Sequence, residues 1–200
     1  MAITSPEIRV AYTQNLIQAK RTDQGVDAWS CTLLIDKQNK AQMAWLTELH
    51  TEAQAVLEAQ WPDPKTRPRI PLVGHDKSPI KDADTNAKVQ SGIPYSESNP
   101  EFAGHYIIPV AAYKNRPVVV DERMQDVLDP GKIQGGDWVK ANVNPYARTR
   151  ADNPGVSIGL NGIQFIREGE ERFGGGRPSA DSMFSPVPGA DPAVGDNPFA

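Results

Sequence analysis

The sequence predicts a mainly β protein. A five-stranded Greek-key barrel with one inserted helix fits best, and a β-sandwich is the alternative. Five or six short stretches alternate apolar and polar residues, as strands do because successive side chains point to opposite faces. Residues 39–61 instead have the three-or-four spacing of an amphipathic helix. The 200-residue chain has 18 Pro and 16 Gly, which favours many turns. Closure removes exposed edges from small all-β domains, and this favours the barrel.

The first two strands are predicted to form a hairpin. Residues 8–20 alternate, with Ile8, Val10 and Tyr12 on one face. The polar stretch 22–25 ends in a glycine, which adopts positive φ without steric cost, so a turn is expected there. The strand after this turn places four apolar side chains on one face: Trp29, Cys31, Leu33 and Ile35.

A helix is predicted to begin after Asn39 and to end at Trp61. Asn39 is a favoured N-cap residue, and Gln42 holds the position of a capping-box partner. Pro62 ends the helix because proline disfavours helical geometry in the residue before it. His50 is interpreted as a packed or half-exposed residue, because no second histidine lies at metal-ligand spacing. The predicted apolar stripe comprises Met43, Leu46, His50, Ala53 and Leu57.

Residues 62–100 form a long, irregular insertion that prolines interrupt. A loop of this length inside a compact domain is usually functional or disordered. Two interpretations stay open for its first part, namely a basic arm that contacts phosphates or a solvated loop. The basic arm comprises Lys65, Arg67, Arg69, Lys77 and Lys81.

Four further strands are predicted after the insertion. In residues 104–113, Pro109 lacks the N–H that a sheet ladder needs, so this strand is expected at an edge or a bulge. A valine run then leads into a short helical turn and loop over 121–136. After the strand over 137–148, the last strand shifts its alternation at Gly162, where a β-bulge is predicted.

The strand that begins at Trp138 has two different faces. One face is small and apolar, and the other carries two rings, two cations and two amides. Rings stack on bases and cations neutralise phosphates, so the second face suits a nucleic-acid strand. A solvated sheet face is the alternative. The candidate contacts on this strand and beyond it are Trp138, Lys140, Asn142, Tyr146, Arg148, Arg150, Tyr106, Tyr113, Lys114 and Arg116.

Composition limits the class of protein. Of 25 acidic residues, three lie in 178–200, which has no Lys or Arg, so 22 acidic and 21 basic residues remain in 1–177. The body is close to neutral, so overall charge does not favour nucleic acid. The single cysteine, Cys31, excludes a disulfide framework and cysteine-based metal sites, and no cofactor is expected. Without a signal-peptide pattern or a membrane-spanning apolar stretch, a soluble cytosolic protein is expected.

The last part of the chain is predicted to be a tail. Past Glu168 the sequence is rich in Gly, Pro, Ser and Asp, which cannot bury enough apolar surface to order. We therefore expect a domain over residues 1–175 and a flexible acidic tail over 176–200. Such a tail can compete with DNA for a cationic, ring-bearing groove.

Three segments together resemble a family of bacteriophage single-stranded DNA-binding proteins. They read GHYIIPVAAYKNRPVVVD, GGDWVKANVNPYAR and GVSIGLNGIQFIREGE, and a Gly-rich exit follows. The family, long catalogued as a domain of unknown function, is related to the T7-type binding proteins, and the resemblance covers about residues 1–175. It implies an OB-fold that coats single-stranded DNA during phage replication and recombination, in the cytoplasm of the infected host. A homo-oligomer stays open.

The resemblance also implies that the tail recruits replication or recombination proteins. The end of the chain is similar to the Asp-x-Pro-Phe tip of bacterial single-stranded DNA-binding proteins. It departs from that pattern because few acids lie near the tip and Ala200 moves the chain carboxylate off the phenylalanine. The residues expected to bind partners are Asp191, Asp196, Pro198 and Phe199.

Two other functions are alternatives to a non-catalytic DNA-binding role. A metal-dependent nuclease needs an acid and a lysine on one face of a strand, but Asp137 and Lys140 are three apart and point to opposite faces. A protein-only interaction or virion-assembly module suits the near-neutral body. It leaves the face with Trp138 and Tyr146 unexplained.

Overall fold

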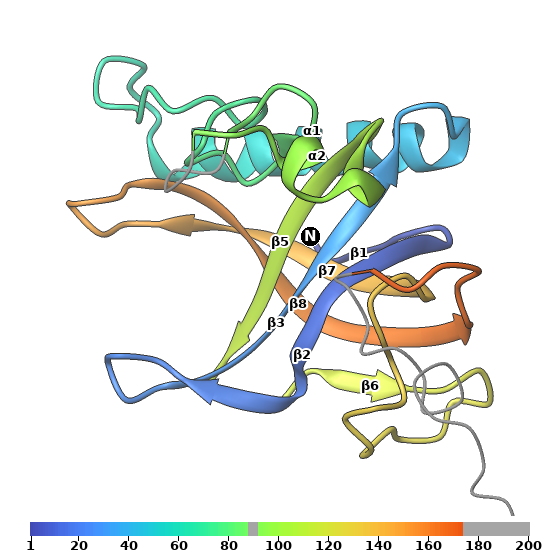
Figure 1. Cartoon of the computed structure of the whole chain (residues 1–200). Coiled ribbons are helices and arrows are strands. Elements are labelled where there is room, and N and C mark those ends of the chain that lie inside the picture. The colour runs from blue at the N-terminus through green and yellow to red at the C-terminus, as the bar shows by residue number, and fades with distance from the viewer. Residues whose placement is uncertain (88–91, 174–200) are drawn as a thin grey trace, which may run out of the picture.

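Five strands close into a ring at the centre of the computed structural model, which describes residues 1–87 and 92–173. In ring order they are β2 (Ile8–Arg21), β3 (Asp27–Asp36), β5 (His105–Tyr113), β8 (Gly155–Arg167) and β7 (Trp138–Arg148) (Figure 1). β5 and β8 pair in parallel, and the other neighbours pair antiparallel. The ring is not a regular barrel, because β2 meets β7 only at Ile8 and Arg9. A mainly β protein with an OB-like fold is confirmed.

Three shorter strands extend this sheet. They are β1 (Ile3–Thr4), which pairs with β7, β4 (Lys81–Asp82), which pairs with β5, and β6 (Val118–Val120), which runs parallel to β8. The described part of the sheet therefore has eight strands, where five or six were predicted. β6 approaches β8 so closely that a Cβ at Gly162 would lie 2.8 Å from the Val118 oxygen.

The interior of the ring is apolar because the inward positions of its strands carry aliphatic side chains. Burying one such side chain stabilises the fold by about 1.5–3 kcal/mol. In β8 the inward set changes phase, because Asn142 pairs with Gly162 while Val143 pairs with Leu160. Asn161 is the extra residue, and the predicted bulge is confirmed. Fully or almost fully buried members of the core include Ile8, Val10, Leu33, Ile35, Ile108, Val139, Leu160 and Ile163.

The β2–β3 hairpin is confirmed, but the alternation predicted for β2 fails at Tyr12. Pairing with β3 is irregular between Ala11 and Asn15, and Tyr12 has a φ of 53°. Ala11 lies on the outer side of the sheet, buried with Leu34 and Phe102, and the irregularity puts Tyr12 on that side too, where it is 40% exposed. A bulge shifts the two-residue period by one position, which apolar alternation alone does not reveal.

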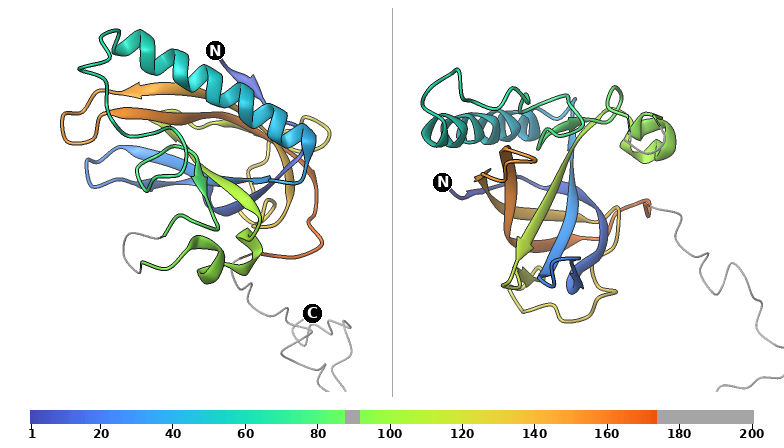
Figure 2. Two further views of the ribbon diagram at one scale, coloured as in Figure 1. Left: turned by 90° about the horizontal axis from the view of Figure 1, so that it is seen from above. Right: turned by 90° about the vertical axis from the view of Figure 1, so that its left-hand side faces the viewer.

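Helix α1 (Lys40–Gln60) lies across one end of the barrel (Figure 2). The Asn39 side chain accepts hydrogen bonds from the backbone N–H of Ala41 and Gln42, so the N-cap is confirmed, and Trp61 is the C-cap. Gln42 does not complete a capping box. Its side chain is buried, accepts from the Asp36 N–H at 2.7 Å and donates to the Glu7 oxygen at 2.9 Å.

The buried face of α1 is turned relative to the predicted stripe. His50 is exposed, and Met43 is only partly buried. Leu46, Ala53 and Leu57 are buried as predicted, and the other buried residues are Gln42, Trp45 and Leu49.

The insertion is more ordered than predicted over its described residues, 62–87 and 92–100. Leu72 and Ile80 are buried, Val73 forms a bridge with Ile80, and β4 then pairs with β5. Two short helices, α2 (Tyr95–Ser98) and η1 (Pro100–Phe102), lead into β5. The described part of the insertion therefore packs against the barrel.

β5 is an interior strand, so the edge strand or bulge expected at Pro109 is wrong for the strand as a whole. Pro109 itself lies where β5 has a neighbour on one side only. β3 pairs with β5 along its whole length. On the other side, β4 pairs at Tyr106 and Ile107 and β8 at Val110 and Ala111. Pro109 falls in the gap between those two pairings, so its missing N–H interrupts neither. No helix follows β6 within 121–136, where the Asp121 carboxylate instead accepts from the N–H groups of Arg123 and Gln125.

Residues 168–173 pack against the barrel, which corrects the expectation that order ends at Glu168. Asp137 is fully buried, accepts from the Gly169 N–H at 3.0 Å and pairs with Arg172. Gly136 has a φ of 103°, and a Cβ there would collide with the Glu171 oxygen. The predicted tail over 176–200 lies outside the described residues. Within the described part of the chain, no helix is long and apolar enough to cross a membrane.

Candidate functional site

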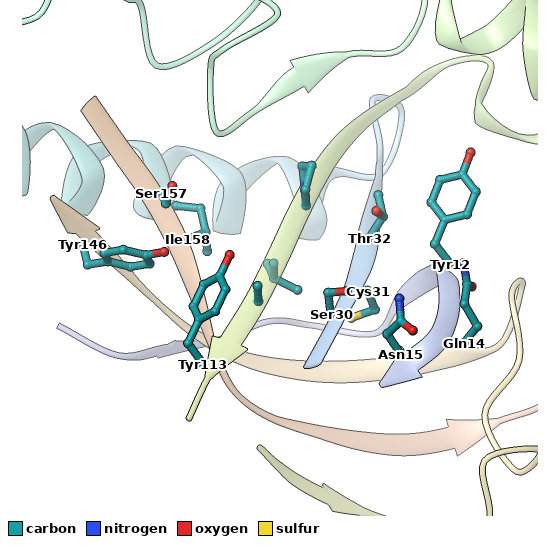
Figure 3. Close-up of a pocket in the computed structure, with 13 residues that line it drawn as sticks. Tyr12, Gln14, Asn15, Ser30, Cys31, Thr32, Tyr113, Tyr146, Ser157 and Ile158 are labelled. Atoms are coloured by element: carbon teal, nitrogen blue, oxygen red, sulfur yellow. The ribbon is translucent and has the colours of Figure 1, made fainter. Parts of the chain in front are cut away.

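A groove crosses the outer surface of β3 and β5. Its central depression, of about 300 Å³, has tyrosines at both ends and small polar side chains between them. Figure 3 shows Tyr113 and Tyr146 at one end and Tyr12 at the other. We call this surface, with the two depressions that adjoin it, the tyrosine groove. The side chains that define its centre are Tyr12, Ser30, Thr32, Tyr113, Tyr146 and Ser157.

Two neighbouring depressions share residues with the centre. One, of about 710 Å³, lies between the β2–β3 loop and the β7–β8 loop and is also lined by Tyr113 and Tyr146. The other, of about 290 Å³, is defined by Lys77, Lys81 and Arg148, and we call it the Lys81 depression. Ser157 lines all three, which makes the surface continuous.

The tyrosine rings are presented in different ways. Tyr113 is 52% exposed at the end of β5. Tyr146 is half-buried beside it, and burial, followed by the nearby Tyr113, raises its pKa. Tyr12 packs edge-on against Phe102 at 5.7 Å, and its hydroxyl donates to Asn99 Oδ1 at 3.0 Å. These contacts fix the position of the Tyr12 ring.

Cations line one end of the tyrosine groove. Lys114 follows β5, and Arg148 ends β7. Arg150 is exposed and holds Asp152 with two hydrogen bonds, of 3.1 and 2.9 Å. At the opposite end the charged neighbour of Tyr12 is acidic, because Glu101 raises the Tyr12 pKa after burial does. The groove therefore has a cationic end and a neutral to acidic end.

The floor of the tyrosine groove contains the single cysteine. Cys31 lines the central depression but is only 3% exposed. Burial raises the pKa of its thiol to about 12. Cys31 is a buried core thiol, as the sequence suggested.

The face predicted on β7 does not act as one surface. Trp138 lies between the guanidinium groups of Arg167 at 4.5 Å and Arg9 at 5.8 Å, and its Nε1 donates to Glu170 at 3.3 Å. Lys140 and Asn142 line a separate depression, of about 280 Å³, next to β6. An 11-residue strand rises about 33 Å, and its twist in a closed sheet aims its two ends at different surroundings.

Five other predicted contacts lie away from the tyrosine groove or are engaged elsewhere. The Tyr106 ring lies 5.0 Å from Lys37 Nζ, and Arg116 pairs with Asp126 at 3.3 Å. Arg67 pairs with Glu58 near the end of α1. Lys65 and Arg69 are exposed and line none of the three depressions. The basic arm is thus divided, because Lys77 and Lys81 reach the groove and the rest does not.

Sequence reasoning missed one end of the groove. Tyr12, Gln14 and Asn15 line it from β2, and Ser30 and Thr32 from β3. Ser30 and Thr32 flank Cys31 and alternate with the core positions, which weakly indicated that they lie on the outer face of β3. Tyr12 had none, because only the irregular pairing of β2 exposes it. Among the described residues, no His, Cys, Asp and Glu side chains gather in a group that could hold a metal ion.

The fold and this groove together define a class of protein. OB-folds bind oligonucleotides on the face of their second and third strands, between the first hairpin loop and the loop joining the fourth and fifth strands. Here those elements are β3, β5, the β2–β3 loop and the β7–β8 loop. Exposed rings beside cations are the usual platform for single-stranded nucleic acid. The structure is that of an OB-like protein with exposed rings beside cations in a surface groove.

Comparisons with known proteins agree with this class. The family model described as the single-stranded DNA-binding protein of Enterobacter phage Enc34 matches residues 1–194. The chain belongs to this family. A relative described as putative protein p50, from Acyrthosiphon pisum secondary endosymbiont phage 1, is 23% identical over 184 residues, which are 92% of each protein.

Solved structures show the same fold. The Enc34 single-stranded DNA-binding protein in complex with single-stranded DNA superposes with a TM-score of 0.69, at 20% identity, over 86% of this chain and 89% of that one. The single-stranded DNA-binding protein gp2.5 of bacteriophage T7 superposes with a TM-score of 0.56, at 14% identity, over 97% of this chain and 99% of the other.

Proposed function

We propose that this protein binds single-stranded DNA in the tyrosine groove, without catalysis, during phage DNA replication and recombination. One observation carries the proposal. Two tyrosines, Tyr113 and Tyr146, lie side by side in a groove whose rim carries Lys114, Arg148 and Arg150. Membership of the Enc34 family supports it.

Stacking sets the character of this binding. Tyr113 and Tyr146 offer ring faces that every base can meet, so sequence preference is weak. Lys114, Arg148 and Arg150 supply phosphate contacts, so affinity falls as salt rises because bound counterions are released. The proposed site does not include Trp138, Lys140 and Asn142. Trp138 contacts Arg167, and the other two line the separate depression beside β6.

A titration of labelled oligo-dT, followed by fluorescence anisotropy, tests the proposal. We expect tight binding that weakens steeply with salt, and similar affinities for oligo-dT and mixed sequences. Tyr113→Phe is the matched control for Tyr113→Ala, because it keeps the ring. No binding at low salt, or equal affinity for the Ala and Phe variants, would contradict the proposal.

The proposed role includes the acidic C-terminal segment. Residues 178–200 carry three acids and no Lys or Arg, and they include Asp191, Asp196, Pro198 and Phe199. We propose that this segment competes with DNA for the cationic end of the groove and recruits replication or recombination proteins in the cytoplasm of the infected host. A chain ending at Arg177 should bind oligo-dT more tightly at low salt and lose its partner proteins. Equal affinity of the two chains would leave the segment a solubilising role.

A further inference from the structure

The Lys81 depression brings together cations from distant parts of the chain. Lys77 and Lys81 belong to the insertion, and Arg148 ends β7. The Arg148 guanidinium donates to the Lys77 backbone oxygen at 3.4 Å. Asn153 and Ser157 add an amide and a hydroxyl to the wall. This combination of side chains offers several hydrogen-bond donors to one small volume.

These cations lack the acidic partners that other cations of this chain have. Arg116 pairs with Asp126, Arg150 with Asp152 and Arg172 with Asp137. Among the described residues, neither Arg148 nor Lys81 has a carboxylate within 4.0 Å. The ammonium group of Lys81 donates instead to the backbone oxygen of Asp76.

The one acid in the depression, Asp76, is held by its own loop. Its Oδ1 lies 2.6 Å from His75 Nδ1 and accepts from the Lys77 N–H at 2.9 Å. Three cations, Lys77, Lys81 and Arg148, therefore share the depression with a single carboxylate. The excess of positive charge is local, although the whole chain has a net charge of −4.

Partial burial makes this excess costly. Burial lowers the pKa of Lys81, Asp76 partly restores it, and the Arg148 charge lowers it further. Arg148 Nε and Asn153 Oδ1 are buried without a hydrogen-bond partner among the described residues. An unmet buried donor costs about 1–3 kcal/mol. A bound anion would accept from Arg148 and offset the repulsion between the two cations.

We propose that the Lys81 depression is a phosphate subsite, in which Lys81 and Arg148 together hold one phosphate group of a bound single strand. This inference rests on the proposed function. Tyr146 and Arg148 share a face of β7 and are about 7 Å apart along it, so a base on Tyr146 places its backbone beside Arg148. Phosphate oxygens match the guanidinium fork. The group is a phosphodiester within the strand or a terminal monoester.

Salt-dependent titrations of full-length protein with oligo-dT test the subsite. Lys81→Gln and Arg148→Gln should each weaken binding about tenfold, as expected for a lost charge-assisted hydrogen bond. Removing both cations should lower the slope of log K against log salt by about 0.7, the value for one single-strand phosphate contact. The double variant should lose less than the product of the two single losses, because both cations hold one phosphate. Lys65→Gln, from the exposed part of the same insertion, is the matched control and should change neither quantity.

Oligo-dT with hydroxyl ends, a 5′-phosphate or a 3′-phosphate separates the two sources of the phosphate. Equal affinities for the three place an internal phosphodiester in the subsite. Tighter binding of one phosphorylated end, lost in Lys81→Gln, places a terminal monoester there.

Two outcomes would overturn the subsite while leaving the proposed function intact. Lys81→Gln and Arg148→Gln could bind like the wild type while Tyr146→Ala does not, or the losses of the single variants could multiply in the double variant. If the wild type bound no oligo-dT, the proposed function would fail on its own. The subsite would then be judged by the NMR signal of the Arg148 Nε–H group. Inorganic phosphate should shift it in the wild type and not in Lys81→Gln, and an unshifted wild-type signal would overturn the subsite.

Discussion

The two ends of β7 carry the same kinds of side chain in different surroundings. At one end Trp138 lies between Arg9 and Arg167, and Glu170 accepts from its indole N–H. At the other end Tyr146 borders an open groove beside Tyr113. Both rings belong to the outward face of one strand. At the first end, side chains of the protein itself contact the Trp138 indole. At the second end, the Tyr146 side chain borders a groove that is open to a ligand.

The difference shows what strand alternation leaves open. A period of two says which face a side chain is on, and nothing about which other segments reach that face. Residues 168–173 return past Arg9 and Asp137 and cover the Trp138 end. No described segment covers the Tyr146 end in the same way. We therefore expect substitutions at the first end to change stability and those at the second to change binding.

The largest expected effect is on stability at the covered end. Asp137→Asn should lower the free energy of unfolding by on the order of 3 kcal/mol, because it removes the charge from a fully buried carboxylate that pairs with Arg172. Chemical denaturation measures this. Asp152→Asn, at an exposed pair by the groove, is the control and should cost well under about 1 kcal/mol. Equal losses for the two would mean that residues 168–173 do not hold this end together.

Ring removal gives the next largest effect, and it separates the two ends directly. Tyr146→Ala should cost about 1–3 kcal/mol of binding free energy for oligo-dT, because a stacking surface is lost. Trp138→Ala should change that binding by less than about 0.5 kcal/mol while it lowers stability. Anisotropy titration gives the binding free energy of each variant, and thermal unfolding gives the melting temperature of each. A large binding loss from Trp138→Ala would return that end of β7 to the DNA site.

Cation removal should give a smaller effect that follows the same division. Lys114→Gln, next to Tyr113, should lower the salt slope by about 0.7, as one single-strand phosphate contact does. Lys140→Gln lies on β7 but lines the depression beside β6, so its slope should match the wild type. The measurement is oligo-dT affinity at a series of salt concentrations. Matching slopes for both variants would remove Lys114 from the site.

The smallest expected effect is a pH dependence at the covered end. The pKa of Glu170 is lowered from 4.5 to about 2, first by a hydrogen bond from the backbone N–H of Glu170 itself and then by hydrogen bonds from Trp138 and Arg167. A pKa lowered by folding means that the charged form stabilises the fold above about pH 4.5, and that this contribution is lost as pH falls towards about 2. The difference in melting temperature between wild type and Glu170→Gln should therefore shrink over that range. A constant difference would contradict it.

Much of the fold could be predicted from local patterns. The hairpin around Gly25, the cap at Asn39, the end at Trp61 and the bulge at Gly162 follow from turn, cap and alternation rules that involve near neighbours in sequence. The packing of the insertion did not follow, because its burial depends on Leu72 and Ile80 meeting distant elements. No residue near them in sequence signals that contact.

Residues of the candidate groove were predicted only where a local pattern and the tertiary surroundings agree. Tyr146 and Arg148 were found from alternation, and Lys81 from its charge, yet nothing in the sequence placed Lys81 beside Arg148. Tyr12 was placed on one face with Ile8 and Val10, because the irregular pairing that exposes it arises from contacts with β3 and not from its neighbours in sequence. Pairing between distant segments decides each of these cases.

The position of Cys31 means that its reaction with thiol reagents reports local opening of the barrel around β3. Cys31 is the chain's single cysteine, lies in the groove floor and has a thiol pKa of about 12. Thiol reagents attack the thiolate, so the closed protein is almost inert to them at neutral pH. Alkylation then requires a local excursion that separates β3 from its neighbours, and its rate measures how often that happens. A ligand spanning β3 and β5 would slow the same reaction, so one covalent label reads barrel dynamics and groove occupancy together.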